Sequence, residues 1–275
     1  MQEKTPLVII GYGSQAKAWA LNLRDSKRDI IIALRSNSSS TQSVEKLGFK
    51  CISLASRELM QYKHFIMLTP DHTHIEILKE SYEFMPSDAT VTYAHGFSFL
   101  QGELNQSFPK LNHLMLAPKA IASEVRFQYE TAGKLGAAYS IEASRDREIH
   151  TSYILELAKD LGITAGPYNS NFEEETYADL FSEQSILCSL LPYAALHSYN
   201  KLREKGIQQE IAYLECWYEV KLIADAMVKM GPQKFFKLIS PNALLGGEKA
   251  QELFFDKAYQ EKLNSLVYDI WIESF

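Results

Sequence analysis

Short apolar runs alternate with amphipathic segments over roughly the first 165 residues of the chain. Each run has four or five residues and is bounded by glycine, proline or polar residues, which is typical of strands in a sheet covered on both faces. The predicted strands are Leu7–Ile10, Ile30–Leu34, Phe65–Leu68, Thr90–Tyr93, His113–Leu116 and Ala137–Ile141. Helical spacing of apolar residues predicts helices over Gln15–Asp25, His74–Phe84 and Glu148–Leu161. This alternation predicts an α/β domain with a parallel, doubly wound sheet.

The pattern changes after Asn171, where the apolar positions keep only helical periodicity to the end of the sequence. Turn residues interrupt this periodicity at Lys205-Gly206, Gly231-Pro232 and Ser240–Asn242. A chain of 275 residues is long enough for two domains. We therefore predict an α/β domain over residues 1–171 and an all-helical domain over residues 172–275.

The composition narrows the class of protein, with 46% hydrophobic and 23% charged residues and a net charge of −6. The acidic balance argues against binding to nucleic acids or anionic membranes. The cysteines Cys51, Cys188 and Cys216 are widely spaced and form no C-x-x-C motif, so we expect reduced thiols. No apolar run approaches 18 residues, and the N-terminus lacks a signal-peptide pattern. We therefore expect a soluble cytoplasmic protein.

A glycine-rich motif follows the first predicted strand and opens the first helix. Gly11-Tyr12-Gly13-Ser14-Gln15-Ala16 matches the dinucleotide-binding pattern G-x-G-x-x-[G/A] in the context that the pattern requires. Gly11 permits a tight turn, Gly13 lets backbone N–H groups approach a pyrophosphate, and the helix N-terminus favours the anion. The motif therefore predicts a Rossmann-type domain that binds a dinucleotide through residues 11–15. The alternative is an ordinary glycine-rich turn between strand and helix.

The end of the second predicted strand indicates which dinucleotide binds. An NAD site usually has an acidic residue there for the ribose 2′-hydroxyl, but residues 35–40 contain no carboxylate. Arg35 with Ser38 and Ser40 supplies a cation and hydroxyl groups that suit a 2′-phosphate. We therefore predict NADP(H), the alternative being a solvated polar turn.

Two acidic pairs stand out in the predicted helical domain. Asp179 and Glu183 are four residues apart, as are Glu215 and Glu219, so each pair shares one face of a helix. Both pairs have apolar neighbours, and desolvated like charges at this spacing repel each other. A divalent cation would offset that repulsion, and four carboxylates could hold two Mg²⁺ ions. The alternative is a pair of solvated acidic faces.

In combination these features resemble the ketol-acid reductoisomerase family, in family order over nearly the whole chain. The most specific matches are the Asp-Leu-Phe-x-Glu-Gln run at residues 179–184 and the Glu-x-x-x-Glu-x-Lys-Leu-Ile run at residues 215–223. The matching stretches are Gly11–Gln15, Ala20–Ser26, Pro70-Asp71, Ala94–Phe97, Ala117–Lys119, Val125-Arg126, Glu174–Thr176, Asp179–Gln184, Ala212–Glu215, Glu219–Ile223 and Ile239-Ser240.

The resemblance implies an activity and a set of site residues. Family members convert a 2-aceto-2-hydroxy acid to a 2,3-dihydroxy acid with NADPH and two Mg²⁺ ions, in the synthesis of valine, isoleucine and the other branched-chain amino acids. By resemblance, Pro70 and Asp71 belong to the cofactor site, and His95 and Lys119 handle protons beside the nicotinamide and substrate. The metal ligands are then Asp179, which bridges both ions, and Glu183, which also counts as catalytic, together with Glu215 and Glu219; Ser240 binds the substrate.

The resemblance also bears on assembly, because this chain is similar to the short form of the family, with one helical domain. It implies a knotted helical domain and a homodimer in which the helical domains intertwine. Glu215, Glu219 and Ser240 would then complete the site of the partner.

Some loops depart from the family pattern. Ala120-Ile121-Ala122 replaces Gly-Pro-Gly, and we expect the added side chains to crowd a loop near the cofactor. Asn242–Gly246 replaces Thr-Ala-Glu-Tyr-Gly after the substrate-binding serine. These changes leave two alternatives to the family reaction: a plain NADPH-dependent 2-keto acid reductase, and a non-catalytic dinucleotide-binding protein.

Overall fold

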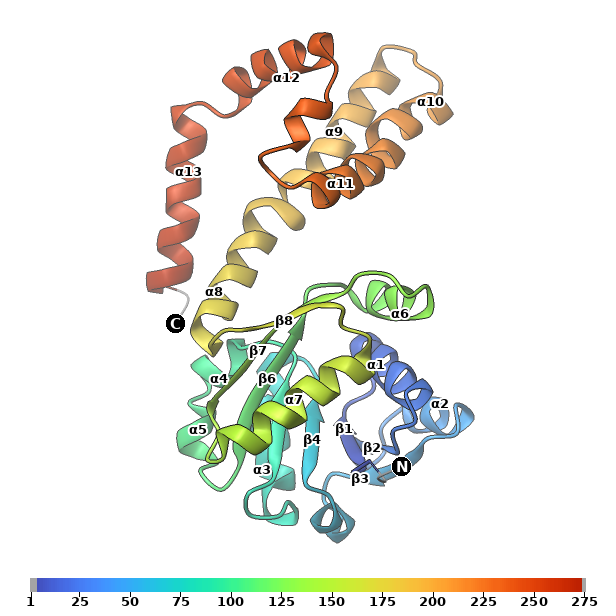
Figure 1. Cartoon of the computed structure of the whole chain (residues 1–275), viewed down its shortest axis with the longest axis vertical. Coiled ribbons are helices and arrows are strands. Elements are labelled where there is room, and N and C mark those ends of the chain that lie inside the picture. The colour runs from blue at the N-terminus through green and yellow to red at the C-terminus, as the bar shows by residue number, and fades with distance from the viewer. Residues whose placement is uncertain (1–3, 274–275) are drawn as a thin grey trace. The chain divides into compact units, whose positions relative to one another are not determined.

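A computed structural model describes residues 4–273 and divides the chain into two compact units after Thr176 (Figure 1). Helix α8 (Phe172–Ser182) begins in the first unit and continues into the second. The division lies a few residues beyond the boundary expected at Asn171. Among the described residues, no helix combines the length and the apolar character needed to cross a membrane.

The first unit is built on an eight-stranded sheet with the order β3-β2-β1-β4-β5-β6-β7-β8. Strands β1 to β6 are parallel, β7 runs antiparallel to β6, and β8 is parallel to β7. The order of the six parallel strands is that of a dinucleotide-binding Rossmann sheet, as the sequence predicts. The strands are β1 (Leu7–Ile10), β2 (Ile30–Leu34), β3 (Lys50–Ser53), β4 (His64–Met67), β5 (Thr90–Tyr93), β6 (Asn112–Pro118), β7 (Gly136–Ala143) and β8 (Ala165–Asn169).

The two edge strands, β3 and β8, are absent from the sequence-based prediction. In β3 only Ile52 is buried, and β8 has no buried residue, so neither forms a continuous apolar run. An edge strand has one side without a neighbouring strand and is less covered, which removes the signal that identifies a buried strand. The sheet is therefore wider than its apolar runs indicate.

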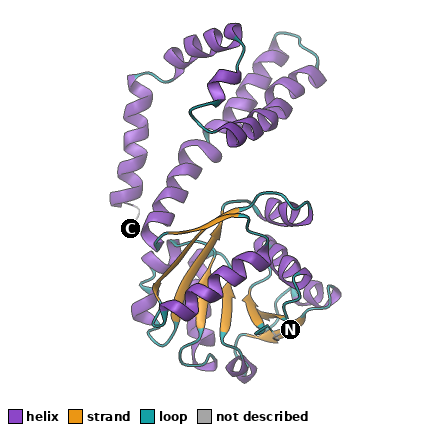
Figure 2. Cartoon of the chain, viewed as in Figure 1, coloured by secondary structure: helices purple, strands orange, loops and turns teal. Residues whose placement is uncertain are grey.

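Helices cover both faces of the sheet, which explains the continuous apolar runs of its central strands (Figures 1 and 2). Alternate residues of β1 point to opposite faces: Leu7 and Ile9 enter one buried cluster, and Val8 and Ile10 enter the other. The helices are α1 (Ser14–Asp25), α2 (Thr41–Lys46), α3 (His74–Ser81), α4 (Phe97–Gln101), α5 (Leu104–Ser107), α6 (Ala122–Glu130) and α7 (Arg147–Leu161). The buried apolar residues of α1, α6 and α7 belong to the first cluster, and those of α3 and α5 belong to the second.

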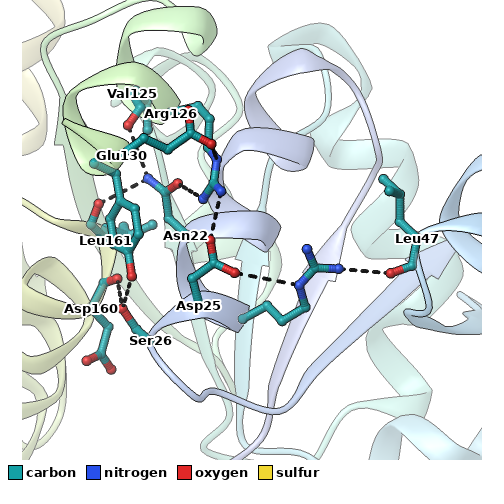
Figure 3. Close-up of polar contacts among 11 residues, drawn as sticks. Asn22, Asp25, Ser26, Leu47, Val125, Arg126, Glu130, Asp160 and Leu161 are labelled. Atoms are coloured by element: carbon teal, nitrogen blue, oxygen red, sulfur yellow. Dashed lines mark hydrogen bonds and ion pairs between the residues drawn. The ribbon is translucent and has the colours of Figure 1, made fainter.

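A polar network joins α1, α6 and α7 (Figure 3). Asn22 is fully buried, and its amide donates to the carbonyl oxygens of Val125 at 3.1 Å and Leu161 at 3.2 Å. Its carbonyl accepts from Arg126 at 2.9 Å, and Arg126 also pairs with Asp25 at 2.7 Å. Each polar group of the buried amide has a partner, so the network fixes the helix packing without an orphaned donor. The network thus gives a packing role to Ala20–Ser26 and Val125-Arg126, two of the stretches in which the sequence resembles the family.

The described residues of the second unit form helices and loops without strands (Figure 2). Its buried apolar side chains are Ala195, Ala212, Cys216, Phe235 and Ile270. The α-helices after α8 are α9 (Leu190–Glu204), α10 (Gln209–Tyr213), α11 (Glu219–Met230), α12 (Pro241–Phe254) and α13 (Lys257–Tyr268). Three π-helical turns accompany them, at Glu183–Leu187, Leu214–Tyr218 and Asp269–Glu273. Five buried apolar residues are few for a unit of this length, so the described part of a single chain gives this unit only a small hydrophobic core.

Two histidines of the first unit are held neutral by their surroundings. His113 is fully buried, and the Tyr93 hydroxyl donates to its Nδ1 at 2.9 Å while its Nε2–H donates to the Phe108 carbonyl at 3.3 Å. His64 stacks on Tyr153 with a centroid distance of 4.1 Å. Burial is the main cause that lowers the pKa of each histidine to about 4.

These depressed values predict that acid destabilises the protein in a defined range. An unfolded histidine titrates near pH 6.5, so the unfolded chain binds more protons than the folded chain between about pH 6.5 and pH 4. The free energy of unfolding is expected to fall by up to about 1.4 kcal/mol per pH unit for each of His64 and His113 in this range. Urea unfolding at several pH values measures it. The His113→Gln variant should show a shallower slope than wild type, and equal slopes would contradict the assignment.

Candidate active site

The glycine-rich turn is set by the close approach of two strand ends. Gly11 has a φ of +95°, and a Cβ there would lie 2.5 Å from Thr69 Cγ2 and 3.1 Å from the Leu68 carbonyl oxygen. Both the dihedral angle and the contact therefore require glycine. A Cβ on Gly13 would have no neighbour within 4 Å, so the space beside this residue is open at the start of α1. That geometry suits the approach of an anion to the helix N-terminus.

A cavity of about 280 Å³ lies at the carboxyl ends of β1, β2 and β4. Seven of the ten predicted cofactor residues line it: Gly11, Tyr12, Gly13, Arg35, Ser38, Ser40 and Pro70. Thr69 and Thr73, which the sequence analysis does not single out, line it as well. Of the remaining three, Ser14 begins α1, Asp71 begins a short 3₁₀ turn, and Gln15 donates to the Ala120 carbonyl at 3.1 Å. The roles of all ten stay predictions.

A second group of side chains gathers on a buried carboxylate, that of Glu175. Glu175 is 3% exposed, and its Oε2 accepts the Gly96 N–H at 3.0 Å. Its other oxygen accepts from the Lys119 ammonium group, and His95 Nε2 lies 3.8 Å from Oε2. The structure thus brings the predicted residues His95 and Lys119 together on a carboxylate that sequence reasoning did not select.

The position of Glu175 on the same helix face as Phe172 is the feature of the sequence that could have identified it. Phe172, Glu175 and Thr176 are the buried residues of α8, at spacings of three and four, whereas Glu173 and Glu174 are exposed. In sequence the three glutamates are adjacent and look equivalent. Only the buried apolar Phe172 marks the face on which a carboxylate would need a partner.

Gly96 lets the start of α8 approach this loop closely. A Cβ on Gly96 would lie 2.6 Å from the Phe172 carbonyl oxygen, and the ring of Phe172 stacks on Phe99 with a centroid distance of 3.9 Å. The backbone of α8 therefore rests against residue 96, which places Glu175 over the Gly96 amide. The Gly96 φ is −84°, so the requirement for glycine comes from contact rather than from the dihedral angle.

The altered loop at residues 120–122 does not need glycine. No residue of this segment has a positive φ, and Ile121 is 71% exposed, directed away from the core. The Lys119 amide donates to the Gly136 carbonyl at 2.9 Å, which anchors the start of the loop. The backbone of this segment therefore accepts side chains at all three positions, and their effect on a bound cofactor stays a prediction.

The two acidic pairs of the second unit lie at junctions between α-helix and π-helical turns. Asp179 is on α8 and Glu183 opens the turn Glu183–Leu187, where the Cys188 N–H donates to the Glu183 carbonyl at 2.9 Å. Glu215 lies in the turn Leu214–Tyr218, and Glu219 begins α11. π-Helical turns are rare in proteins, and those that occur are often found at functional sites.

The surroundings of these carboxylates differ from the expectation. Glu183, Glu215 and Glu219 are exposed, and so are apolar neighbours such as Trp217 and Leu222, so a single chain does not desolvate them. Among the described residues, none of the three glutamates belongs to a group of three His, Cys, Asp or Glu side chains close enough to share an ion. Ser240, the predicted substrate ligand, is exposed and precedes α12.

Comparisons with known proteins cover both units. A family model described as the acetohydroxy acid isomeroreductase NADPH-binding domain matches residues 1–166, and the ketol-acid reductoisomerase C-terminal domain matches residues 172–275. The ketol-acid reductoisomerase (NADP⁺) of Helicobacter pylori is 37% identical over 249 residues, 89% of this chain and 74% of that protein.

Solved structures with the same fold also match. An NADH-preferring ketol-acid reductoisomerase from an uncultured archean has a TM-score of 0.81 and 24% identity, over 97% of this chain and 82% of that chain. A semialdehyde dehydrogenase NAD-binding protein from Cupriavidus necator has a TM-score of 0.73 and 15% identity, over 97% and 98% of the two chains. At these identities the structures establish the shared fold.

Adding a side chain at Gly96 is expected to cause a steric clash with α8, without strain in the backbone dihedral angles. Gly96→Ala is expected to push α8 from the loop and to lower the free energy of unfolding by about 1–3 kcal/mol, because the new Cβ meets backbone atoms. Gly136→Ala is the control, since its Cβ would lie 3.7 Å from the nearest atom, the Ala165 carbonyl oxygen. Thermal or urea unfolding compares the two variants, and equal stability would contradict the close approach.

Proposed function

The chain belongs to the ketol-acid reductoisomerase family, and we propose that it converts 2-acetolactate-type 2-aceto-2-hydroxy acids to 2,3-dihydroxy acids with NADPH and Mg²⁺. The observation that carries this proposal is the buried Glu175 with Lys119, His95 and Gly96 gathered on it. His95 and Gly96 follow β5 and Lys119 follows β6, at the same end of the sheet as the dinucleotide cavity. In open α/β sheets, ligands bind at the carboxyl ends of parallel strands.

The residues of the cavity fit a phosphorylated dinucleotide. Gly11 permits the tight turn after β1, and Gly13 leaves the backbone accessible where α1 begins, which suits a pyrophosphate. Arg35, Ser38 and Ser40 line the part of the cavity that follows β2, and a guanidinium with hydroxyl groups suits a 2′-phosphate. When bound, NADPH supplies the hydride, and the protein positions it.

Glu175 positions Lys119 and His95, the two side chains that we propose to be catalytic. An ionised carboxylate only accepts hydrogen bonds, so the Gly96 amide and the Lys119 ammonium each bind one of its oxygens. This contact tethers Lys119 Nζ at the end of β6, where the ammonium can donate to a substrate oxygen and pass a proton to it. His95 Nε2, at 3.8 Å from Glu175 Oε2, can exchange a proton with the carboxylate through a water or a small displacement.

The acidic pairs fit Mg²⁺ by the chemistry of their donors, because carboxylate oxygens are the ligands that this ion prefers. When bound, the ions would acidify the tertiary hydroxyl of the substrate and polarise its carbonyl. Asp179 and Glu183 of one chain would hold them, with Glu215 and Glu219 from a second chain. Ser240 of that second chain would bind the substrate. The exposure of the three glutamates in a single chain supports this division.

The apolar surface of the second unit supports a homodimer with intertwined, knotted helical domains. On α11 alone, Leu222, Ile223, Met227 and Val228 are between 47% and 81% exposed. Exposed apolar side chains also occur on α9, α12 and α13, at Leu190, Leu191, Leu196, Leu245, Leu253, Phe254 and Val267. A monomer rarely exposes so many large apolar side chains to solvent, and a second copy offers an apolar surface to cover them.

The homodimer is tested by disrupting α11. The double variant Ile223→Glu/Met227→Glu places two charges one turn apart on its apolar surface and is expected to dissociate the dimer or prevent its assembly. Phe127→Glu, at a 53% exposed position of α6 in the first unit, should leave assembly unchanged. Sedimentation equilibrium gives the mass of each, and a monomeric wild type would refute the proposal.

The reaction is tested by NADPH oxidation with 2-acetolactate, in Mg²⁺ and again in EDTA. Turnover is expected only with the metal. Asp179→Asn should abolish it, and Glu175→Gln should lower kcat by about 100-fold or more, because Lys119 loses its anionic partner. Glu173→Gln, an exposed neighbour on the same helical turn, should keep full activity.

Each other outcome identifies an alternative. Metal-independent NADPH oxidation with 3-hydroxypyruvate or another 2-keto acid, without turnover of acetolactate, would indicate a plain reductase. The exchange of residues 242–246 after Ser240 makes that result chemically reasonable. NADPH binding without any turnover, insensitive to Asp179→Asn, would indicate a non-catalytic dinucleotide-binding protein.

A further inference from the structure

An ion pair sits at the rim of the dinucleotide cavity. Arg35 is the one charged residue among the described side chains that line the cavity, and its Nη2 lies 3.3 Å from Glu76 Oε2. Glu76 belongs to α3, whose residue Ile77 lines the cavity, as does Thr73 just before the helix. The carboxylate is therefore held next to the only cation that the cavity lining offers to a 2′-phosphate.

The position of Glu76 is fixed by the packing of α3. Ile77 and Leu78 are buried, and His74, at the start of the helix, donates from Nε2 to the Thr69 carbonyl at 2.9 Å. The Ser98 hydroxyl donates to His74 Nδ1 at 2.6 Å, so both sides of the imidazole are anchored. A helix held at its first turn and along its buried face keeps the backbone of Glu76 beside the cavity, within reach of Arg35 for its carboxylate.

A carboxylate at this place treats the two dinucleotides differently. The 2′-phosphate of NADPH carries about two negative charges, so Glu76 repels it and competes with it for the Arg35 guanidinium. The ribose 2′-hydroxyl of NADH is neutral and can donate a hydrogen bond to a carboxylate. Glu76 therefore lowers affinity for one cofactor without the same cost to the other.

We propose that Glu76 is a determinant of cofactor specificity, which weakens the preference for NADPH and lets the site accept NADH. This inference rests on the proposed dinucleotide function of the same cavity. Arg35 attracts the 2′-phosphate, Glu76 opposes it, and the balance between them sets the ratio of the two affinities. The wild-type affinities for NADPH and NADH are expected to lie within about tenfold of each other, because both partners are solvent-exposed and their effects are partly screened.

Binding of two fragments that lack the nicotinamide tests the proposal. Calorimetric titration with 2′-phospho-ADP-ribose and with ADP-ribose separates the phosphate contribution from turnover. Glu76→Gln should strengthen binding of the phosphorylated fragment by about threefold to tenfold at low salt, with no gain for ADP-ribose. Arg35→Gln should weaken binding of the phosphorylated fragment selectively. Glu80→Gln, an exposed residue one turn farther along α3, is the control for the same change in charge.

The outcomes separate this inference from the cofactor proposal on which it rests. A gain for Glu76→Gln that exceeds that of Glu80→Gln and shrinks at high salt would support the specificity role. Equal effects of the two variants, or an unchanged ratio of the two affinities, would overturn that role while leaving the dinucleotide site intact. Failure of the wild type to bind either fragment would overturn both.

Discussion

The need to pair one buried carboxylate organises the first unit. Glu175 lies almost entirely out of water, where an unpaired negative charge would be costly. The Gly96 amide after β5 and the Lys119 ammonium after β6 bind its two oxygens. Three segments that are distant in sequence therefore meet at one point. The catalytic group of the proposed function is this arrangement, so stability and chemistry depend on the same contacts.

The dinucleotide cavity depends on a different constraint, the spacing of parallel strands. The turn after β1 passes so close to the end of β4 that Gly11 has no room for a side chain. Two residues later, Gly13 has open space beside it at the start of α1, and Arg35 lines the cavity just after β2. α3 then sets Glu76 against that cation. In the proposed cofactor site, the turn after β1 would bind the phosphate groups, whereas Arg35 and Glu76, from two other elements, would set the preference between cofactors.

The second unit shows what a single chain leaves incomplete. Few of its apolar side chains are buried, and three of its four predicted metal-ligating carboxylates are exposed. Both acidic pairs lie where an α-helix meets a π-helical turn, a feature that costs regular hydrogen bonding. A second copy that covers the apolar surface and shares the metal ions would account for these properties together.

Local periodicity and backbone freedom at single residues were enough to predict the class of fold, most of the buried strands and the glycine-rich turn. Resemblance to the family added the prediction that Lys119 and His95 are catalytic. Only the tertiary structure distinguished Glu175 from the adjacent Glu173 and Glu174, since its partner Lys119 lies 56 residues away. Likewise, Arg35 meets Glu76 across 41 residues, and β3 and β8 take their places at the sheet edges without an apolar run. Contacts between segments that are distant in sequence leave no local pattern of residues. They could therefore be seen only in the folded structure.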